Sequence, residues 1–381
     1  MKRVKVFLAV VVVVLVCLSV FISAGWFTTP QPNREFYVGA EYAYGSNPQE
    51  VKALVDKVKG YTNLLVLGSS DLTFNESALT ESCNYIADAG MHFIIMFTDI
   101  TKYAYNTSVW TSDAQEKYGS LLLGIYRYDE PGGIQLDQPA SRNYSIMVPH
   151  ADNYSDAASK YTNYMYYHVD YYHLYFDNIS VVTADYGLYW YDYKASYDTI
   201  LAEFVWNQSR LTPIALCRGA AETQGKDWGI IVTWKYDQAP YLESADELYS
   251  DLRLAYEAGA KYAVVFSYPQ LDSYGTLTQE HLDAIQRFWD SIQNNPQSFG
   301  ENKAEAVYVL PKDYGFGFRR ADDTIWGVFP ADELSTKIWA DVNLLESRYG
   351  SRFNIIYDDG LDYAKINQTY KEVFFWNQTI T

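Results

Sequence analysis

Short apolar runs alternate with amphipathic stretches along most of the chain. Eight runs rich in β-branched and aromatic residues predict strands, at 36–44, 63–69, 92–99, 121–130, 181–190, 199–206, 229–236 and 262–269. The stretches between them, such as 48–61, 77–90, 155–176, 211–226 and 244–260, predict helices, with 211–226 the least regular. This alternation predicts an α/β protein with a (β/α)8 TIM barrel over residues 34–295. A doubly wound open sheet is the alternative, although no glycine-rich phosphate loop follows the first strand.

The pattern restarts after a linker rich in Pro, Gly and Asn at residues 294–303. Residues 304–311, 353–359 and 371–377 predict three further strands, and residues 331–350 predict a helix that stops at Gly350. We therefore expect a small three-layer α/β domain of the flavodoxin type, with a parallel sheet, over residues 303–381.

The first thirty residues have a composition of their own. Lys2, Arg3 and Lys5 precede an uncharged, mostly apolar stretch from Val6 to Phe27. Such a stretch is long enough to cross a hydrocarbon layer of roughly 30 Å. The sequence predicts an N-terminal transmembrane helix within residues 1–30, with the rest of the chain outside the plasma membrane by the positive-inside tendency. The alternative is a cleaved signal segment and a secreted protein.

Triplets of the form Asn-X-Ser/Thr occur eight times. They begin at Asn75, Asn106, Asn143, Asn153, Asn178, Asn207, Asn367 and Asn377. Because such triplets accept N-linked glycans outside the cell, they predict a surface glycoprotein, typical of microbial, including archaeal, cell envelopes. A glycan on Asn207 would crowd any cleft at Glu203, so either Asn207 is unmodified or the cleft lies elsewhere. The alternative is that composition alone produces these triplets.

The charge and composition of the chain argue against several classes of function. The net charge is −18, and removing the three basic residues at the start of the chain leaves −21. Such a surface repels phosphate backbones, which argues against nucleic-acid binding. The five His residues lack metal-ligand spacing, and no phosphate loop is present, so we expect no metal and no cofactor. Cys83 and Cys217 are expected to be separate buried thiols.

Acidic residues gather at the predicted carboxyl ends of the strands, where barrels place their chemistry. They are Glu41, Asp99, Asp129, Glu130, Asp185, Glu203 and Asp237. Two carboxylates that face each other across a glycosidic bond suffice for its hydrolysis. Glu130, in "GIYRYDEPGG" at residues 124–133, is the first candidate for the catalytic acid. Glu203 is expected to be its partner carboxylate, and Asp185 is expected to orient one of these two side chains. The alternatives are that Glu130 braces a loop and that Glu203 pairs with Arg218.

Aromatic residues cluster at the same strand ends, and the chain contains 37 Tyr in all. Flat rings of this kind bind sugars by stacking, although a barrel interior also needs bulk. We expect substrate contacts from a set of polar and aromatic residues. The set comprises Glu41, Arg127, Tyr128, Asp129, Trp190, Trp206, Trp234, Tyr236, Asp237 and Tyr268.

The "YDEP" motif at residues 128–131 resembles the Asn-Glu-Pro of retaining glycoside hydrolases with (β/α)8 barrels, in which the Glu is the acid/base. The barrel with a small second domain also resembles β-galactosidases that carry an amidotransferase-like domain. The resemblance implies an acid/base at Glu130. Their nucleophile is a Glu that ends strand seven, where this chain has only Asp237 in "IIVTWKYDQAP". Other barrel glycosidases pair strands four and six, which makes Glu203 the partner.

These observations together predict a membrane-anchored, extracellular glycoside hydrolase that acts on a polysaccharide or glycan by paired-carboxylate catalysis. The rival prediction is a barrel without hydrolysis, serving as a carbohydrate-binding or structural envelope glycoprotein. The missing Glu after strand seven favours the rival.

Overall fold

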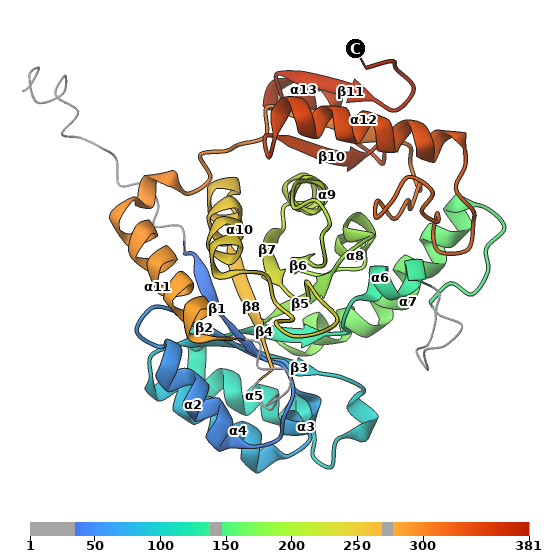
Figure 1. The fold of residues 1–381 in the computed structure, drawn as a ribbon. Helices are drawn as coiled ribbons and strands as arrows, with labels where there is room; N and C mark the ends of the chain where they lie inside the picture. Colours follow the sequence, from blue (N-terminus) through green and yellow to red (C-terminus); the bar gives the residue numbers. More distant parts are fainter. Residues whose placement is uncertain (1–34, 138–146, 269–276, 381) are drawn as a thin grey trace, which may run out of the picture. The chain divides into compact units, whose positions relative to one another are not determined.

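Eight parallel strands close into a barrel in the computed structural model, which describes residues 35–137, 147–268 and 277–380 (Figure 1). They are β1 (Tyr37–Tyr42), β2 (Leu64–Leu67), β3 (His92–Phe97), β4 (Leu122–Arg127), β5 (Ser180–Asp185), β6 (Thr199–Phe204), β7 (Asp227–Val232) and β8 (Tyr262–Ser267). The barrel closes because β8 pairs with β1, with Tyr262 opposite Tyr37. The predicted (β/α)8 barrel is therefore confirmed.

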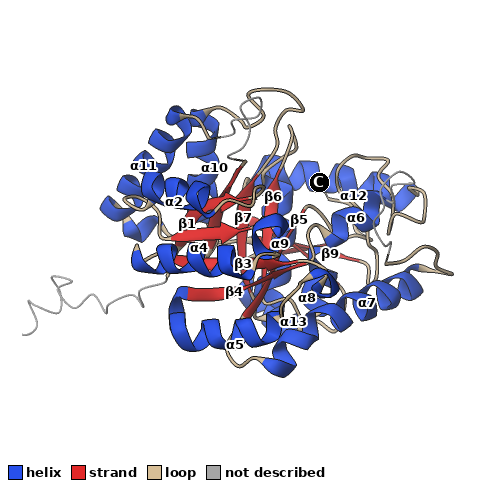
Figure 2. Ribbon diagram, turned by 90° about the horizontal axis from the view of Figure 1, so that it is seen from below, coloured by secondary structure: helices blue, strands red, loops and turns tan. Residues whose placement is uncertain are grey.

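Helices lie outside the strands, as Figure 2 shows. They are α2 (Pro48–Val58), α3 (Ser70–Thr73), α4 (Glu76–Asp88), α5 (Thr107–Tyr118), α6 (Pro131–Asp137), α7 (Tyr154–Tyr175), α8 (Tyr189–Lys194), α9 (Leu211–Gln224), α10 (Ala245–Ala258) and α11 (Gln279–Asn294). Local chemistry fixes several of their starts. At α10, for example, the Ser244 hydroxyl accepts from the backbone N–H of Glu247, whose carboxylate accepts from the N–H of Ser244.

The strand predicted over residues 181–190 needs correction. β5 ends at Asp185, and residues 189–194 form α8 instead. The turn between them contains Leu188, whose φ of 53° is left-handed. All of Tyr189, Trp190 and Tyr191 are buried, so this helix lacks the alternation of apolar and polar positions by which helices are recognised in a sequence.

Side chains fill the inside of the barrel. The central cluster consists of Tyr37, Leu64, Val66, Ile94, Met96, Tyr126, Val182, Ala184, Leu201, Ile231, Tyr262 and Val264. Along β3 and β8 its members stand two residues apart, because alternate residues of a strand point to the same side. The barrel is thus a packed core, and a ligand can enter only beyond the ends of its strands.

A second, smaller sheet of three parallel strands follows the barrel, with the order β10-β9-β11. Its elements are β9 (Ala306–Leu310), α12 (Glu333–Tyr349), β10 (Phe353–Tyr357), α13 (Tyr363–Thr369) and β11 (Glu372–Phe375). The sheet packs against α9 of the barrel (Figure 1). A Cβ on Gly219 of α9 would lie 2.4 Å from the carbonyl oxygen of Ile355, so glycine lets the helix touch β10.

Arg218 ties this sheet to the barrel from within. Its side chain is 1% exposed and donates to the Asn354 Oδ1 atom at 2.8 Å and to the Ser351 carbonyl at 2.6 Å. It also donates to the Ala258 carbonyl at 3.3 Å. Residues 37–381 accordingly form one compact unit. The domain boundaries at 295 and 303 stay predictions.

The predicted membrane span at residues 6–27 lies outside the described residues. Within the part that the structure describes, no helix has both the length and the apolarity to cross a bilayer. Cys83 on α4 and Cys217 on α9 are both buried and free, so this prediction is confirmed.

Seven of the eight Asn-X-Ser/Thr asparagines are exposed, and the eighth, Asn143, lies outside the described residues. Three of them cap helices: Asn75, Asn106 and Asn153 each accept backbone N–H groups at the starts of α4, α5 and α7. Capping uses Oδ1 and a glycan is attached at Nδ2, so these positions remain open to modification. Capping also gives an independent reason for Asn at these sites.

Candidate functional site

A cavity of about 1310 Å³ lies at the carboxyl ends of the barrel strands. Its lining includes Met96 of β3, Tyr126 of β4, Ala184 of β5 and Ile231 of β7. These four side chains also belong to the central cluster of the barrel. The cavity therefore begins where the packed interior ends, in the position that barrel enzymes use for catalysis.

Seven described carboxyl groups line this cavity, and four of them lie at the ends of β1, β4 and β6: Glu41 of β1, Asp129 and Glu130 after β4, and Glu203 of β6. Glu41 is 8% exposed and Glu203 is 6% exposed. Glu41 fits because Gly68 has no side chain, since a Cβ there would lie 1.9 Å from the Glu41 Oε1 atom. Burial, together with the nearby charges of Asp129 and Glu130, raises the pKa of Glu41 to about 8.

Glu130 and Glu203 form a hydrogen-bonded pair of carboxyl groups. Burial raises the pKa of Glu203 well above its usual range, and the nearby charges of Glu130 and Asp129 act in the same direction. This shift favours the protonated form of Glu203, which can donate its proton in the hydrogen bond to Glu130. The alternative pairing of Glu203 with Arg218 is wrong, because Arg218 binds the small sheet.

The loop that carries Glu130 is strained and held from several sides. Tyr128 and Glu130 have left-handed φ values of 63° and 49°, and the following Pro131 further restricts the backbone of Glu130. The Thr183 hydroxyl donates to the Tyr128 carbonyl at 2.6 Å, and the Glu130 N–H donates to the Ala184 carbonyl at 3.1 Å. Strain of this kind persists where the surroundings impose it, and it is common at functional sites.

Asp185 lies behind this loop and does not line the cavity in the described residues. Its carboxylate accepts the N–H groups of Gly132 at 2.5 Å and Gly133 at 2.8 Å. A Cβ on Gly133 would overlap the Tyr186 ring at 2.1 Å, so glycine is needed for this close approach. Asp185 thus fixes the start of α6, directly after Glu130. Burial raises the pKa of Asp185 to about 7, although its N–H partners oppose that shift.

Most of the predicted contact residues line the cavity. They are Glu41, Arg127, Tyr128, Asp129, Trp206 and Trp234, and Asp99, predicted among the acidic residues at the strand ends, also lines it. Trp206 also has a left-handed φ, of 49°. Where the resemblance implies a Glu after strand seven, the structure places Thr233 and Trp234, and no carboxylate follows β7 among the described residues of the lining.

Four predicted contact residues do not line the cavity in the part of the chain that the structure describes. Trp190 is buried on α8, with its ring 5.5 Å from that of Tyr357 in the small sheet. Tyr236 and Asp237 point to solvent in the turn after β7. Tyr268 packs 4.3 Å from Tyr44, which does line the cavity.

Some lining residues were not predicted because they come from distant parts of the chain. Arg319 and Arg320 belong to the loop between β9 and α12, which we call the wall loop (residues 311–332). Arg319 forms ion pairs with Asp137 at the end of α6 and with Asp323, the latter at 2.8 Å. The wall loop thereby braces the helix that follows Glu130 and closes one side of the cavity.

Helix α7 contributes two further unpredicted residues, Tyr164 and His168. The His168 ring lies 4.9 Å from that of Tyr164 and 6.0 Å from that of Tyr128. In the sequence these residues are indistinguishable from the other aromatics of "YTNYMYYHVDYYHLYF". Only the fold shows which of them face the cavity.

Comparison with known protein families and with curated proteins finds no match to this sequence. Solved structures do share its fold. A β-galactosidase from Rahnella sp. R3 superposes with a TM-score of 0.57 at 11% identity, covering 91% of this chain and 67% of its own. A β-galactosidase from Marinomonas ef1 superposes with a TM-score of 0.54 at 9% identity, covering 89% of this chain and 72% of its own. A β-galactosidase from the haloarchaeon Halorubrum lacusprofundi superposes with a TM-score of 0.53 at 11% identity, covering 89% of this chain and 69% of its own. The chain therefore has a glycoside hydrolase-like barrel fold.

Proposed function

We propose that this protein is a glycoside hydrolase of polysaccharides or glycans, with Glu130 and Glu203 as its catalytic pair. The observation that carries this proposal is the hydrogen bond between two carboxyl groups, one from the loop after β4 and one from β6, in a cavity at the carboxyl end of the barrel. The fold shared with β-galactosidases supports the same reaction class.

Glu203 is the proton donor in this proposal, because burial raises its pKa and favours its protonated form. It protonates the glycosidic oxygen while the Glu130 carboxylate attacks the anomeric carbon and forms a glycosyl–enzyme ester. Glu203, now ionised, then takes a proton from the water that hydrolyses the ester. These roles are the reverse of those that the "YDEP" resemblance implies.

A direct hydrogen bond leaves no room for a water molecule between the two carboxyl groups. Inverting enzymes separate theirs by roughly 6.5–9.5 Å to admit that water. Retaining enzymes hold theirs about 5–5.5 Å apart, so the close pair of Glu130 and Glu203 is nearer to the retaining arrangement, and the two groups would have to separate slightly to admit the sugar.

The other lining residues have roles in binding. Protonated Glu41 is positioned to donate a hydrogen bond to a sugar hydroxyl, and Asp129, which accepts from the Tyr126 hydroxyl, is positioned to accept one. Trp206 and Trp234 offer flat faces on which sugar rings stack.

Two matched substitutions test the roles. Glu203→Gln cannot donate a proton, so cleavage of ordinary glycosides should fall by about 10²- to 10⁴-fold. Aryl glycosides with an activated leaving group should be largely spared in the cleavage step. Glu130→Gln should abolish cleavage of both kinds, because it removes the nucleophile. Addition of azide to the smaller Glu130→Gly variant should restore turnover and give the inverted glycosyl azide.

Asp129→Asn is the matched control on the neighbouring residue. It should weaken binding, seen as a higher KM, while leaving azide without effect. Azide rescue of an Asp129→Gly variant but not of Glu130→Gly would assign the nucleophile to Asp129 and refute the proposed pair.

The missing carboxylate after β7 keeps a second function open, a carbohydrate-binding envelope protein without hydrolysis. Its signature is glycan binding by the full-length chain with no product, unchanged in both Glu130→Gln and Glu203→Gln.

The proposal includes an extracellular position, anchored in the plasma membrane by residues 6–27 and carrying N-linked glycans. The apolar stretch and the exposed Asn-X-Ser/Thr sites support it. Fractionation should recover the intact chain with membranes, and protease added to whole cells should remove the barrel. Recovery of a soluble chain that begins near Gly25 would indicate a cleaved signal instead.

A further inference from the structure

An aromatic stripe follows one side of α7. We define it as Tyr164, Tyr167, His168, Tyr171 and Tyr175. Tyr164, His168, Tyr171 and Tyr175 recur at i, i+4, i+7 and i+11, which places them in one line along a helix. Tyr167 flanks this line. The adjoining edge of the helix is buried through Tyr161, Met165, Val169 and Tyr172.

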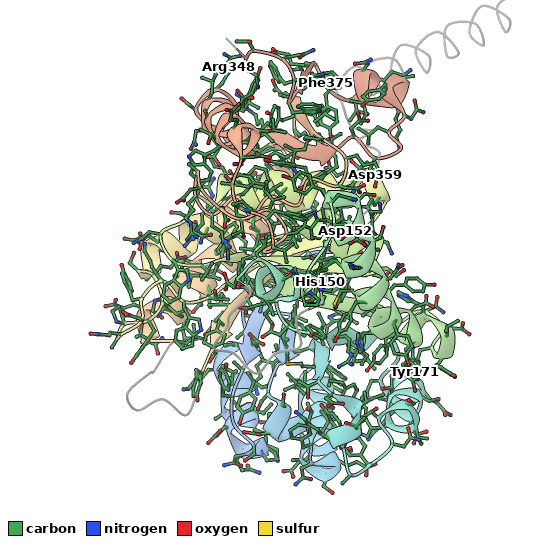
Figure 3. The ribbon with its side chains drawn as sticks, turned by 90° about the vertical axis from the view of Figure 1, so that its right-hand side faces the viewer. His150, Asp152, Tyr171, Arg348, Asp359 and Phe375 are labelled. Carbon is green, nitrogen blue, oxygen red and sulfur yellow. The ribbon has the colours of Figure 1, made fainter. Side chains whose placement is uncertain are left out.

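The rings of the stripe are ordered against each other while their faces stay open. Tyr167 is 79% exposed and Tyr175 is 67% exposed. The Tyr171 ring lies 4.7 Å from that of Tyr175, and its hydroxyl group is 2.6 Å from the Ser108 Oγ atom of α5. Figure 3 shows Tyr171 at the edge of the molecule, well away from Arg348 of α12 and Phe375 of β11. Exposed aromatic rings gathered in this way mark an interaction site.

The stripe is continuous with the cavity. Tyr164 and His168 belong to both, and Tyr164 is hydrogen-bonded to Tyr128, which lies next to Asp129 in the strained loop. From Tyr164 the stripe extends over eleven residues of helix, or about 16 Å. A ligand that fills the cavity and continues past His168 would therefore meet these rings in succession.

We propose that the aromatic stripe of α7 is a binding site for the part of a neutral polysaccharide chain that extends beyond the cavity. The inference rests on the proposed function. Tyrosine rings stack on the apolar faces of sugars while their hydroxyl groups bind sugar hydroxyls. No member of the stripe is a carboxylate or an amine, which suits an uncharged polymer. A net charge of −18 disfavours the other large ligands that bind aromatic surfaces, anionic membranes and nucleic acids.

Tyr167→Ala/Tyr175→Ala tests this site, because both side chains are exposed and their loss should leave folding intact. Tyr166→Ala is the matched control: it lies on the same helix, is 45% exposed, and faces Asp170 away from the stripe. The full-length proteins are run through gels that contain soluble β-galactan, β-mannan or β-glucan. The double variant should lose at least tenfold in affinity for the polymer that retards the wild type, and Tyr166→Ala should not.

Kinetics provide the second measurement. The double variant should show a raised KM for the polymer and unchanged cleavage of a short aryl glycoside, which fills only the cavity. Equal binding of polymer by wild type and double variant, or retardation of the wild type by none of the three polymers, would overturn the site. A wild type that binds polymer through the stripe without cleaving any glycoside would leave the site standing and refute the proposed hydrolase.

Discussion

The buried Glu41 gives the protein a pH-dependent stability whose sign and size follow from the structure. Burial raises the pKa of Glu41 in the folded protein from 4.5 to about 8. Between these pH values the folded state holds one proton that the unfolded state has lost. The free energy of unfolding therefore falls as pH rises, by about 1.4 kcal/mol per pH unit from this residue, and by about 5 kcal/mol in total.

Glu41→Gln removes this contribution while keeping the size and shape of the side chain. Unfolding of the full-length chain by urea is followed by tryptophan fluorescence at pH 5, 6, 7 and 8. The free energy of unfolding of the variant, relative to that of the wild type, should rise by about 1.4 kcal/mol per pH unit across this range. Asp185 and Glu203 also have raised pKa values, but they are present in both proteins, so their contributions cancel.

Glu247→Gln is the control with the opposite sign. Hydrogen bonds from Lys235 and Ser244 lower the pKa of the Glu247 carboxyl to about 2. The contribution of the Glu247 carboxylate to stability is present above pH 4.5 and is lost only as pH falls towards 2. The difference in free energy of unfolding between Glu247→Gln and the wild type should therefore be constant from pH 5 to 8. A flat difference for Glu41→Gln as well, or one that grows in favour of the wild type, would refute the raised pKa.

Two further predictions concern packing. Gly133→Ala should destabilise the protein by about 1–3 kcal/mol, because the added Cβ would overlap the Tyr186 ring. Gly60→Ala is the control: its Cβ would have no atom within 4 Å, so its stability should stay within about 0.5 kcal/mol of the wild type. Thermal unfolding measures both differences. Arg218→Met should cost about 3–5 kcal/mol, because it leaves buried acceptors of the small sheet unpaired, and a loss below about 1 kcal/mol in urea unfolding would contradict that role.

The sequence contains enough information to predict the barrel but not the ends of its strands. All eight predicted strands exist, yet most stop two or three residues earlier than the apolar pattern. Residues such as Trp206 and Trp234 continue the pattern because they line the cavity or pack beneath it, although their backbone has already left the sheet. Periodicity reports burial, and burial extends past the last hydrogen bond of a strand.

The candidate site was predictable only where its residues follow strands. Glu41, Glu130 and Glu203 could be selected because parallel strands bring their carboxyl ends to one edge of the barrel. Arg319 and His168 come from a distant loop and from the side of a helix, and no local pattern connects them with the strand ends. Trp190 was misplaced because its strand ends at Asp185 and a buried helix follows.

The abundance of tyrosine has a structural explanation besides sugar binding. Buried tyrosines pair their hydroxyl groups with carboxylates, as Tyr161 does with Asp192 and Tyr308 does with Asp341. In a chain with 47 acidic and 29 basic residues, such pairs satisfy carboxylates for which too few cations exist. Composition alone therefore overestimates the number of tyrosines available to a ligand.

The wall loop also sets an order of events during synthesis. The ribosome releases Asp137 and the Glu130 loop long before Arg319, which follows Asp137 by 182 residues. All eight strands of the barrel can emerge and close while one side of the cavity is still absent. A nascent or prematurely terminated chain therefore carries the paired carboxyl groups without the loop that braces them. Cleavage in the linker at 294–303 would leave the wall loop held to the barrel without a covalent link, by its ion pair with Asp137 and by the hydrogen bonds of Arg218 to the small sheet.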